Sequence, residues 1–552
     1  MFHLSITRYF SVSVAAALFV IVTYAANSNI TKAQSSSDPA ITIQALLSND
    51  APGQRASARE LAQLQKVYAE RNFQPIWSGT IEALESARVA KALLARAGEH
   101  GLNPDDYSGA IGSAPRDDTA ERSAEIDVEL TRNVLRYARD LRIGRLLPNA
   151  IYRDVDLPQE TFDAADALSS AVRQGEVAAF FSRLPPPHPD YQRLVAALDK
   201  YRSIVTEGGW PSIPGNPEIK TDGSDPRLRA LMHRLQVEDP AAALPDADPV
   251  AAVKRYQERN GRTVDGRIGA LTLEMLNVSA AERVAQIAAN MERRRWLPRT
   301  FESRYIVVNV PDQTLKLIDS EKVLLSTRVI VGRPQTPTPI FRANVIAVTA
   351  NPPWNVPHSI AVQEILPLLR RNANYLATQN MVLLNGPADD PSGVQINWRR
   401  ISADRFPYQI QQRPGDKNAL GKLKLELPNR FSVFLHDTPG RAAFERDQRA
   451  LSHGCIRVQQ ILPLAALAIG GDAGVAQANI SALIAAGTTA QISLHDPLPV
   501  YVLYWTAIAE EDGSVGFRRD LYGRDQRLSA ALLQRVTALR PIAEMEGCSY
   551  DG

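Results

Sequence analysis

The sequence predicts a multidomain α+β protein in which a helical region precedes a mostly β region. Its 552 residues exceed what one hydrophobic core usually serves, so two or three domains are expected. From residue 51 to about residue 223, Ala, Leu, Arg and Glu recur at helical spacing, as in ARVAKALLARAGEHGL. Further along, ESRYIVVNVPDQTLKLID reads as two strands around a Pro-Asp turn.

The composition is that of an ordinary folded protein. Apolar residues make up 45% of the chain and charged residues 22%. The 62 basic and 60 acidic side chains give a formal charge of +2. We therefore expect neither nucleic acid nor an acidic lipid surface as a dedicated partner.

Residues 1–33 are expected to form an export signal. Arg8 precedes an apolar run from Phe10 to Ala26, and small and polar residues follow. The run is nearly long enough to span a bilayer, so an uncleaved membrane anchor is the alternative. We expect an exported protein that touches the membrane only through this segment.

The stretch ALSHGCIRVQQ holds one of only two cysteines. Cys455 follows His453 and Gly454, and the other cysteine, Cys548, lies in the last few residues. A Cys455–Cys548 bridge is one alternative, but two cysteines make no disulfide framework. His453 and Cys455 have no second ligand pair nearby, which argues against zinc. A nucleophilic thiol is favoured over a buried filler, and it needs a base.

The candidate base is His436. The segment NRFSVFLHDTPG alternates as a half-buried strand that ends at His436 and Asp437. Downstream, QQILPLAALAIGG predicts a helix with Pro463 in its first turn. Cys455 is then expected on the loop that enters this helix, where amide dipoles would help to hold a thiolate.

This spacing resembles the signature of the YkuD-type L,D-transpeptidase catalytic domain. His436 is followed after fifteen residues by Ser-His-Gly-Cys at 452–455. Where the signature often has Asn, this chain has Arg457, which looks like the longer Gram-negative periplasmic branch. The resemblance implies that Cys455 forms a thioester with a donor peptide and that His436 takes the thiol proton. It also implies that the backbone carbonyl of Asp437 orients the imidazole.

The same resemblance implies how the substrate would be held. Amides around His453, Gly454 and Cys455 would form an oxyanion hole, and Ser452 and His453 would shape the pocket. Arg457 would meet a substrate carboxylate, or alternatively would brace the loop through a buried ion pair.

Residues 360–428 exceed what a minimal domain of this family needs. They resemble the capping subdomain of the large periplasmic members, and we expect a lid over the substrate. Its residues of interest are Asn418, Leu420 and Gly421. Before the lid, Trp354 in NPPWNVP would stack on substrate or simply anchor its proline-rich loop.

Residues 224–279 resemble a small helical peptidoglycan-binding module. The resemblance rests on Asp265, Gly266, Gly269 and Thr272, and an ordinary helix pair with a tight turn is the alternative. The remaining boundaries are expected as a helical scaffold over 40–223, a scaffold helix or linker over 280–299, a catalytic domain over 300–510 and a C-terminal extension over 511–552.

The resemblance implies a periplasmic enzyme that makes 3→3 peptidoglycan cross-links from tetrapeptide stems and releases D-alanine. It implies no metal, no organic cofactor and sensitivity to carbapenems. Expected partners are stem peptides and glycan, with cell-wall synthesis proteins as further candidates. An L,D-carboxypeptidase or endopeptidase using the same thioester is one alternative. A non-catalytic wall-binding scaffold protein is the other.

Overall fold

The structure, a computed structural model, describes residues 38–48, 57–108, 120–216, 218–387 and 389–534. The expected export signal, the residues after 534 and Cys548 lie outside these ranges. The chain divides into two compact units. The first unit comprises Met1–Leu94, Ser108–Leu135 and Ala164–Phe180, and the second comprises Ala95–Tyr107, Arg136–Asp163 and Phe181–Gly552.

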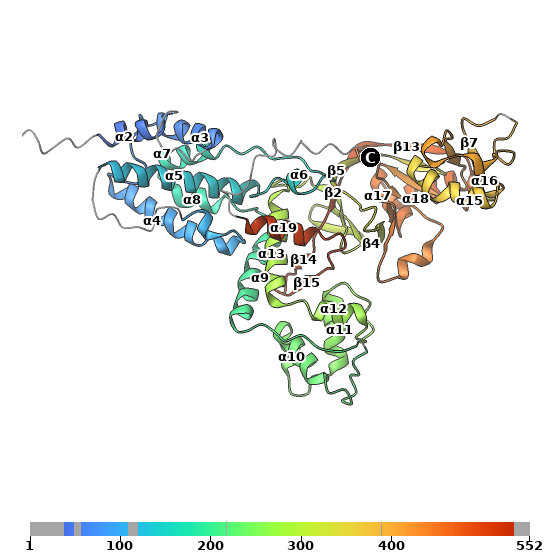
Figure 1. The fold of residues 1–552 in the computed structure, drawn as a ribbon, viewed down its shortest axis with the longest axis horizontal. Coiled ribbons are helices and arrows are strands. Elements are labelled where there is room, and N and C mark those ends of the chain that lie inside the picture. The colour runs from blue at the N-terminus through green and yellow to red at the C-terminus, as the bar shows by residue number, and fades with distance from the viewer. Residues whose placement is uncertain (1–37, 49–56, 109–119, 217, 388, 535–552) are drawn as a thin grey trace, which may run out of the picture. The chain divides into compact units, whose positions relative to one another are not determined.

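The first unit is helical and has a buried polar network at its centre. Asp127 is buried, and its carboxylate accepts hydrogen bonds from the Tyr68 hydroxyl (2.6 Å) and from the backbone amide of Trp77 (2.8 Å). Buried carboxylates need such donors to offset their lost hydration. The helices that contribute to this unit are α2 (Pro39–Leu46), α3 (Ala58–Ala69), α4 (Ile81–Ala95), α5 (Ala120–Ile143), α7 (Ala164–Gln174) and α8 (Val177–Ser182), labelled in Figure 1.

The helical part of the second unit centres on α9 (Pro189–Thr206) and α13 (Ala280–Arg295), which pack side by side (Figure 1). The end of α13 carries buried charges in pairs, such as Arg295 with Glu292 at 2.7 Å. The other helices here are α6 (Pro148–Ile151), α10 (Leu228–Glu238), α11 (Pro249–Arg259), α12 (Ala270–Leu276) and α19 (Arg524–Leu533).

Helices α10, α11 and α12 share a small core of their own in the segment that resembles a wall-binding module. Asp265 accepts hydrogen bonds from the Gln257 side chain and the Arg267 amide, both at 2.8 Å. Gly266 has φ +74°, and Thr272 is buried. The Asp-Gly pair therefore forms a tight turn held by α11.

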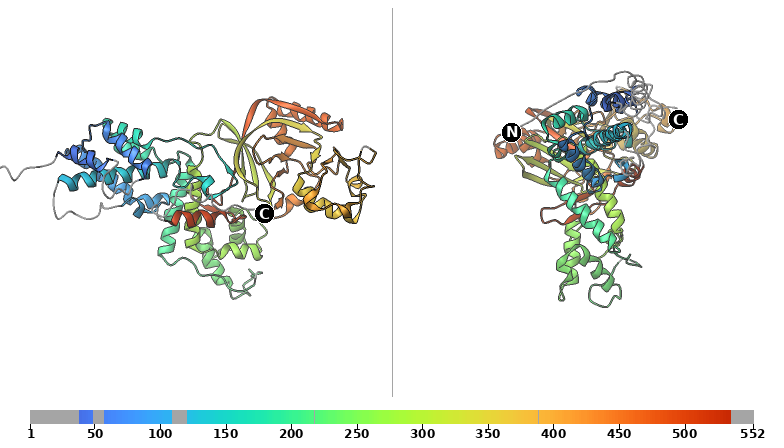
Figure 2. Two further views of the ribbon diagram at one scale, coloured as in Figure 1. Left: turned by 45° about the horizontal axis from the view of Figure 1, so that its top comes forward. Right: turned by 90° about the vertical axis from the view of Figure 1, so that its left-hand side faces the viewer.

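The largest sheet of the second unit closes into a barrel, whose strands curve around one interior in Figure 2. Its order is β5-β13-β2-β3-β4-β12-β10-β9, and β9 pairs again with β5. The barrel therefore has no free edge along this path. Strand β1 pairs with β5, and β11 pairs with β4. The bounds are β1 (Val155–Asp156), β2 (Arg304–Asn309), β3 (Thr314–Asp319), β4 (Lys322–Gly332), β5 (Ile340–Ala350), β9 (Leu423–Glu426), β10 (Leu435–His436), β11 (Ala450–Ser452), β12 (Ile456–Val458) and β13 (Ala490–Leu503).

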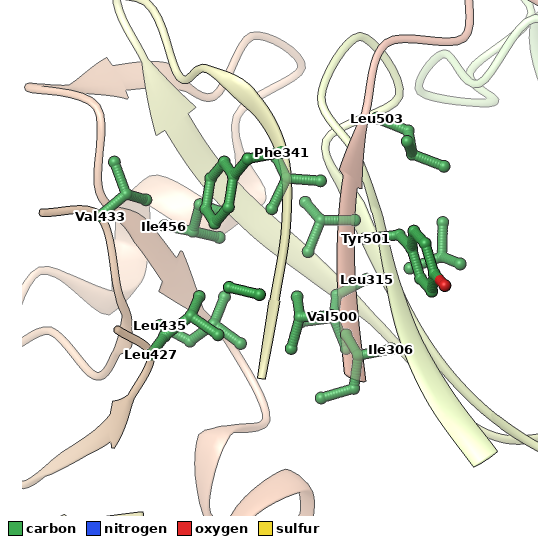
Figure 3. Close-up of a cluster of buried hydrophobic side chains, with 14 of the residues drawn as sticks. Ile306, Leu315, Phe341, Leu427, Val433, Leu435, Ile456, Val500, Tyr501 and Leu503 are labelled. Atoms are coloured by element: carbon green, nitrogen blue, oxygen red, sulfur yellow. The ribbon is translucent and has the colours of Figure 1, made fainter. Parts of the chain in front are cut away.

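The barrel interior is the main hydrophobic core. Leu435 and Ile456, on neighbouring strands, are fully buried and lie near Phe341 in Figure 3. Helix α17 (Ile461–Ile469) packs on this core, and α18 (Ala473–Ala485) follows it. In the part of the chain that the structure describes, no single helix is long and apolar enough to cross a bilayer. Helices α17 and α18 meet that criterion only together, and they are bent by 118°.

Residues 354–412 form a cap subdomain with its own core. Strands β6 (Trp354–Asn355), β8 (Ile410–Gln412) and β7 (Met381–Leu383) make a separate sheet in that order. Helices α14 (His358–Ile360), α15 (Leu366–Arg371) and α16 (Tyr375–Thr378) accompany it, with a π-helical turn at Ala361–Ile365. The structure also has a two-stranded sheet of β14 (Ala507–Ala509) and β15 (Val515–Phe517).

Candidate active site

His436 ends β10 and lies between two paired strands. Leu435 and His436 pair in parallel with Ile456 and Arg457 of β12, and His436 also faces Lys424 on β9. Because Leu435 and Ile456 are buried in the barrel core (Figure 3), the backbone on either side of the site is held firmly.

The imidazole of His436 is oriented by the main chain. Its Nδ1 lies 2.5 Å from the carbonyl oxygen of Asp437. A carbonyl can only accept, so Nδ1 carries the proton and Nε2 of the neutral ring has a free lone pair. Burial and the positive charge of Arg457 lower the pKa of His436 to about 3, although hydrogen bonds to the backbone of Asp437 and Leu420 oppose this. The ring is therefore neutral near pH 7.

Cys455 lies at the end of the adjacent loop, and within the described residues its thiol is not in a disulfide. Its Sγ lies 3.9 Å from the carbonyl oxygen of Ser432, which has φ +54°. Among the described residues, the hydrogen bond of the thiol goes to this carbonyl and not to His436. Burial raises the pKa of the Cys455 thiol, although Lys424 and Arg457 partly counteract this. The resting pair is thus a neutral thiol and a neutral imidazole.

The position of Cys455 corrects one expectation from the sequence. The thiol does not lie on a loop that enters helix α17, because strand β12 (Ile456–Val458) intervenes. The N-terminus of α17 therefore does not adjoin the thiol and does not lower its pKa in the expected way. The side chains of Lys424 and Arg457 instead supply positive charge that favours the thiolate.

Ser452 organises the loop before the thiol. Its hydroxyl donates to the Cys455 carbonyl (2.6 Å) and accepts from the Gly454 amide (3.1 Å). Gly454 has φ +113°, which only glycine adopts readily. The Gly454 amide is therefore occupied by Ser452. Of the three amides expected to form an oxyanion hole, those of His453 and Cys455 donate no hydrogen bond within the described residues.

A second loop, residues 333–338, donates hydrogen bonds to residues 452–455, which we call the catalytic loop. The amide of Arg333 and the hydroxyl of Thr336 both donate to the Ser452 carbonyl, at 2.9 and 3.1 Å. The Thr338 hydroxyl donates to the Gly454 carbonyl at 2.8 Å. These hydrogen bonds hold the carbonyls of Ser452 and Gly454 in place.

His453 connects the catalytic loop to the cap subdomain. Its Nε2 lies 2.5 Å from Glu364 Oε1 and 2.5 Å from Arg333 Nη2. Glu364 belongs to the π-helical turn of the cap. His453 therefore lies where the cap and the catalytic loop meet, as a residue that shapes the pocket would.

Arg457 has no carboxylate partner among the described residues. Its Nε is buried and makes no hydrogen bond there. Lys424, which the sequence reasoning missed, lies on the strand next to His436, pairs with Glu426 at 2.8 Å and sits over the Phe434 ring at 4.5 Å. The alternation in LKLEL, which places this lysine on one face of a strand, was the only available signal for it. The site is thus electropositive, and an unpaired guanidinium suits a substrate carboxylate.

The lid residues named from the sequence brace the histidine. Asn418 is buried and donates to the carbonyls of Pro352 and Arg413, both at 3.1 Å, while its Oδ1 accepts from the Leu420 amide at 2.8 Å. Gly421 has φ +65° and lies directly against the Asp437 side chain. These residues therefore support Asp437, whose carbonyl in turn orients His436.

The remaining candidate residues make contacts that stabilise the local structure. Trp354 is half-buried on β6 and packs against the cap core, as an anchor of its loop would. The Asp437 carboxylate accepts from the Lys422 amide (2.9 Å) and pairs with Arg441 (3.0 Å), so it braces the neighbouring loop. Within the described ranges, no three His, Cys, Asp or Glu side chains are grouped as metal ligands.

The chain is similar to known proteins in two regions. Residues 62–198 match the family model of a scaffold domain, and residues 303–480 match that of the L,D-transpeptidase catalytic domain. A curated protein of Haemophilus influenzae, named as a candidate L,D-transpeptidase, is 32% identical over 246 residues, which cover 45% of this chain. The match covers 49% of that relative, so the chain spans about half of its length.

Two solved structures are also similar. The L,D-transpeptidase from Mycobacterium smegmatis is 14% identical with a TM-score of 0.17, over 36% of this chain and 58% of its own. The L,D-transpeptidase of Xylanimonas cellulosilytica is 13% identical with a TM-score of 0.18, over 53% of this chain and 98% of its own.

The closed barrel with its Cys–His site and the match over residues 303–480 define an L,D-transpeptidase catalytic domain. Residues 303–480 are thus a catalytic domain of the L,D-transpeptidase type, a domain found in acyl-transferring enzymes. It has a helical scaffold domain ahead of a mostly β catalytic domain, so the fold class predicted from the sequence is confirmed.

Proposed function

We propose that the protein forms 3→3 cross-links in peptidoglycan by acyl transfer through a thioester on Cys455. The observation that carries this proposal is the fixed tautomer of His436. Its Nδ1 is held by the Asp437 carbonyl, and its strand β10 pairs with strand β12, which begins directly after Cys455. A thiol with a positioned, neutral base is the arrangement that acyl transfer requires.

In the first half-reaction, the Cys455 Sγ proton moves to Nε2 of His436 while sulfur attacks the carbonyl carbon between the diamino acid and the terminal D-alanine. The tetrahedral oxyanion is stabilised by the amides of His453 and Cys455; one such donor is typically worth about 3 kcal/mol. The carbon–nitrogen bond then breaks, and the departing D-alanine nitrogen takes the proton back from His436. The thioester remains.

In the second half-reaction, the side-chain amine of a second stem attacks the thioester carbon. His436 takes a proton from this amine and returns it to the sulfur as the carbon–sulfur bond breaks. The products are the cross-linked dimer and the free thiol, and no water is consumed. A water molecule in place of the amine would instead give the carboxypeptidase or endopeptidase reaction.

Arg457 and Lys424 supply positive charge that complements the thiolate and a carboxylate of the donor stem. Both side chains favour the thiolate electrostatically, and the Arg457 guanidinium has no acidic partner among the described residues. We propose that it holds a carboxylate of the donor stem and so positions the scissile bond.

We also propose that this chemistry takes place in the periplasm on stem peptides, after export by residues 1–33. The small module over residues 224–279 would keep the enzyme near glycan. A carbapenem would acylate Cys455, because a β-lactam carbonyl can take the place of the donor carbonyl in the first half-reaction.

Incubation with disaccharide-tetrapeptide, read by mass spectrometry, tests the proposal. A dimer lighter than two monomers by one alanine, absent with Cys455→Ala, is the expected result. Tripeptide and free D-alanine without dimer would replace transpeptidation by hydrolysis. No product from the unaltered protein, with Cys455 still reactive toward iodoacetamide, would favour a non-catalytic wall-binding role.

A further inference from the structure

A second cavity lies in the same unit as the active site but has a different lining. Its volume is about 460 Å³, and it is bounded by residues 149–154, by Pro334 and Pro337, and by the start of α19. Cys455, His436 and Arg457 are not among its lining residues. Ligand pockets commonly hold about 300–1,000 Å³, so this cavity is large enough for a ligand of several groups.

Arg524 is the buried charge of this cavity. The residue is 3% exposed, and its guanidinium lies over the rings of Tyr152 at 5.1 Å and Tyr522 at 5.7 Å. One terminal nitrogen, Nη2, pairs with Asp154. The other, Nη1, is buried and has no hydrogen-bond partner within the described residues. Arg524 therefore places a positive charge directly behind the lining of the cavity.

The remaining lining is basic at its rim, and its wall includes several apolar side chains. Arg153 and Arg527 are exposed at the cavity, and Asp154, its sole acidic lining residue among those described, is already paired. Ile151, the two tyrosine rings and the two prolines form the wall. Guanidinium groups bind planar carboxylates well, while such a wall suits short aliphatic side chains and peptide backbone.

We propose that this cavity binds a carboxylate-bearing peptide at a site separate from the thiol. The identity of that peptide rests on the proposed function, under which it is a second peptidoglycan stem. The stem carries several free carboxylates on a short, mostly aliphatic backbone, and this chemistry matches the two exposed arginines and the apolar side chains of the lining. The exposed guanidinium groups of Arg153 and Arg527 would bind these carboxylates.

The cavity adjoins the loop 333–338, which supports the catalytic loop. Pro334 and Pro337 belong to the loop 333–338, whose Thr338 hydroxyl holds the Gly454 carbonyl. On the cavity side, the Tyr522 hydroxyl donates to the Gly332 carbonyl at 2.7 Å and lies 3.3 Å from the Thr338 amide. A peptide in the cavity would therefore touch the reverse face of the loop that holds the catalytic loop.

The experiment uses the full chain with Cys455→Ala, which cannot turn over, and the free tetrapeptide stem as probe. Hydrogen exchange followed by mass spectrometry should show protection of residues 149–154 and 522–527. Combining Arg153→Glu with Arg527→Glu should weaken binding at these segments at least about tenfold, because charge-assisted contacts are lost. Both arginines are exposed, so the fold should tolerate the change. Lys322→Glu, an exposed charge reversal on β4, is the matched control and should have no effect.

A tetrapeptide with amidated carboxyl groups should give no protection at these segments. Protection confined to residues 452–457, or binding at the cavity that is equal for the double variant and the control, would overturn the proposal. The proposed function fails separately: dimer formation by the unaltered enzyme without protection at the cavity would remove only this second site. Protection at the cavity without any dimer or hydrolysis product would remove only the catalytic assignment.

Discussion

Replacement of Gly421 by alanine should disturb the histidine through its neighbour Asp437. An added Cβ would lie 2.4 Å from Asp437 Oδ2 and 2.5 Å from its Cβ and Cγ, and position 421 has φ +65°. The left-handed backbone costs an alanine about 1–2 kcal/mol. The overlap adds about 1–3 kcal/mol, because Asp437 is fixed by Arg441 and by the Lys422 amide. The carbonyl of Asp437 orients His436, so a shift of about 1 Å could lower kcat about 100-fold.

Gly487→Ala is the matched control for this prediction. Gly487 has φ +74°, and no atom lies within 4 Å of the place that an alanine Cβ would take, so alanine there bears the backbone cost alone. Stability is best measured locally, by native-state hydrogen exchange of β9 and β10, because the chain has two units and global unfolding is not one transition. The dimer-forming assay with disaccharide-tetrapeptide gives kcat.

We expect Gly421→Ala to lower both the local free energy of opening and kcat, and Gly487→Ala to leave kcat unchanged. Equal kcat values for the two alanine variants would show that contact between position 421 and Asp437 does not govern the imidazole. The inference that Gly421 positions His436 through Asp437 would then be wrong.

Four further results are expected. Iodoacetamide should alkylate Cys455 at pH 8 more slowly than it alkylates free cysteine, because burial raises the pKa of the thiol; the initial rate against pH measures this. The pKa of His436 is lowered to about 3 from an unfolded value near 6.5, so protons bind the unfolded chain preferentially and stability falls as the pH drops below 6.5. By pH 5 the loss should reach about 2 kcal/mol and be absent in His436→Gln, as local hydrogen exchange would report. Ser452→Ala removes two hydrogen bonds of the catalytic loop, each worth about 0.5–1.5 kcal/mol, and should lower kcat, whereas Ser452→Thr should retain it. Arg457→Gln should raise the donor KM about tenfold or more, since a hydrogen bond to a charged group contributes about 1.5–3 kcal/mol; an unchanged KM would exclude Arg457 from carboxylate binding.

Local patterns in the sequence predicted the elements on both sides of the site. Apolar alternation indicated a strand through NRFSVFLHD, but only Leu435 and His436 form strand β10, so the end of the strand was predicted and its length was not. The apolar run with Pro463 in its first turn indicated a helix, and α17 begins at Ile461. Both are properties of a few consecutive residues, which is why they could be read without knowledge of the fold.

The pKa of the thiol could not be read in this way. Strand β12 has only three residues, too few for a periodic signal, and it forms because Ile456 and Val458 are drawn into the barrel. Its presence removes Cys455 from the helix terminus. Likewise, Lys424 next to His436 and Glu364 on His453 are contacts between distant segments, which depend on how the barrel and cap fold.

The cap is attached in a way that makes it exchangeable. Ala350 of β5 pairs directly with Leu423 of β9, so the whole intervening segment is, topologically, the loop of one β-hairpin. At its base, Asn355 and Gln411 are already antiparallel partners. A two-residue turn between them would excise the cap as a cassette and leave the segment that braces His436 in place. Different caps could thus be grafted onto one catalytic barrel, and the choice of substrate could evolve without alteration of the chemistry.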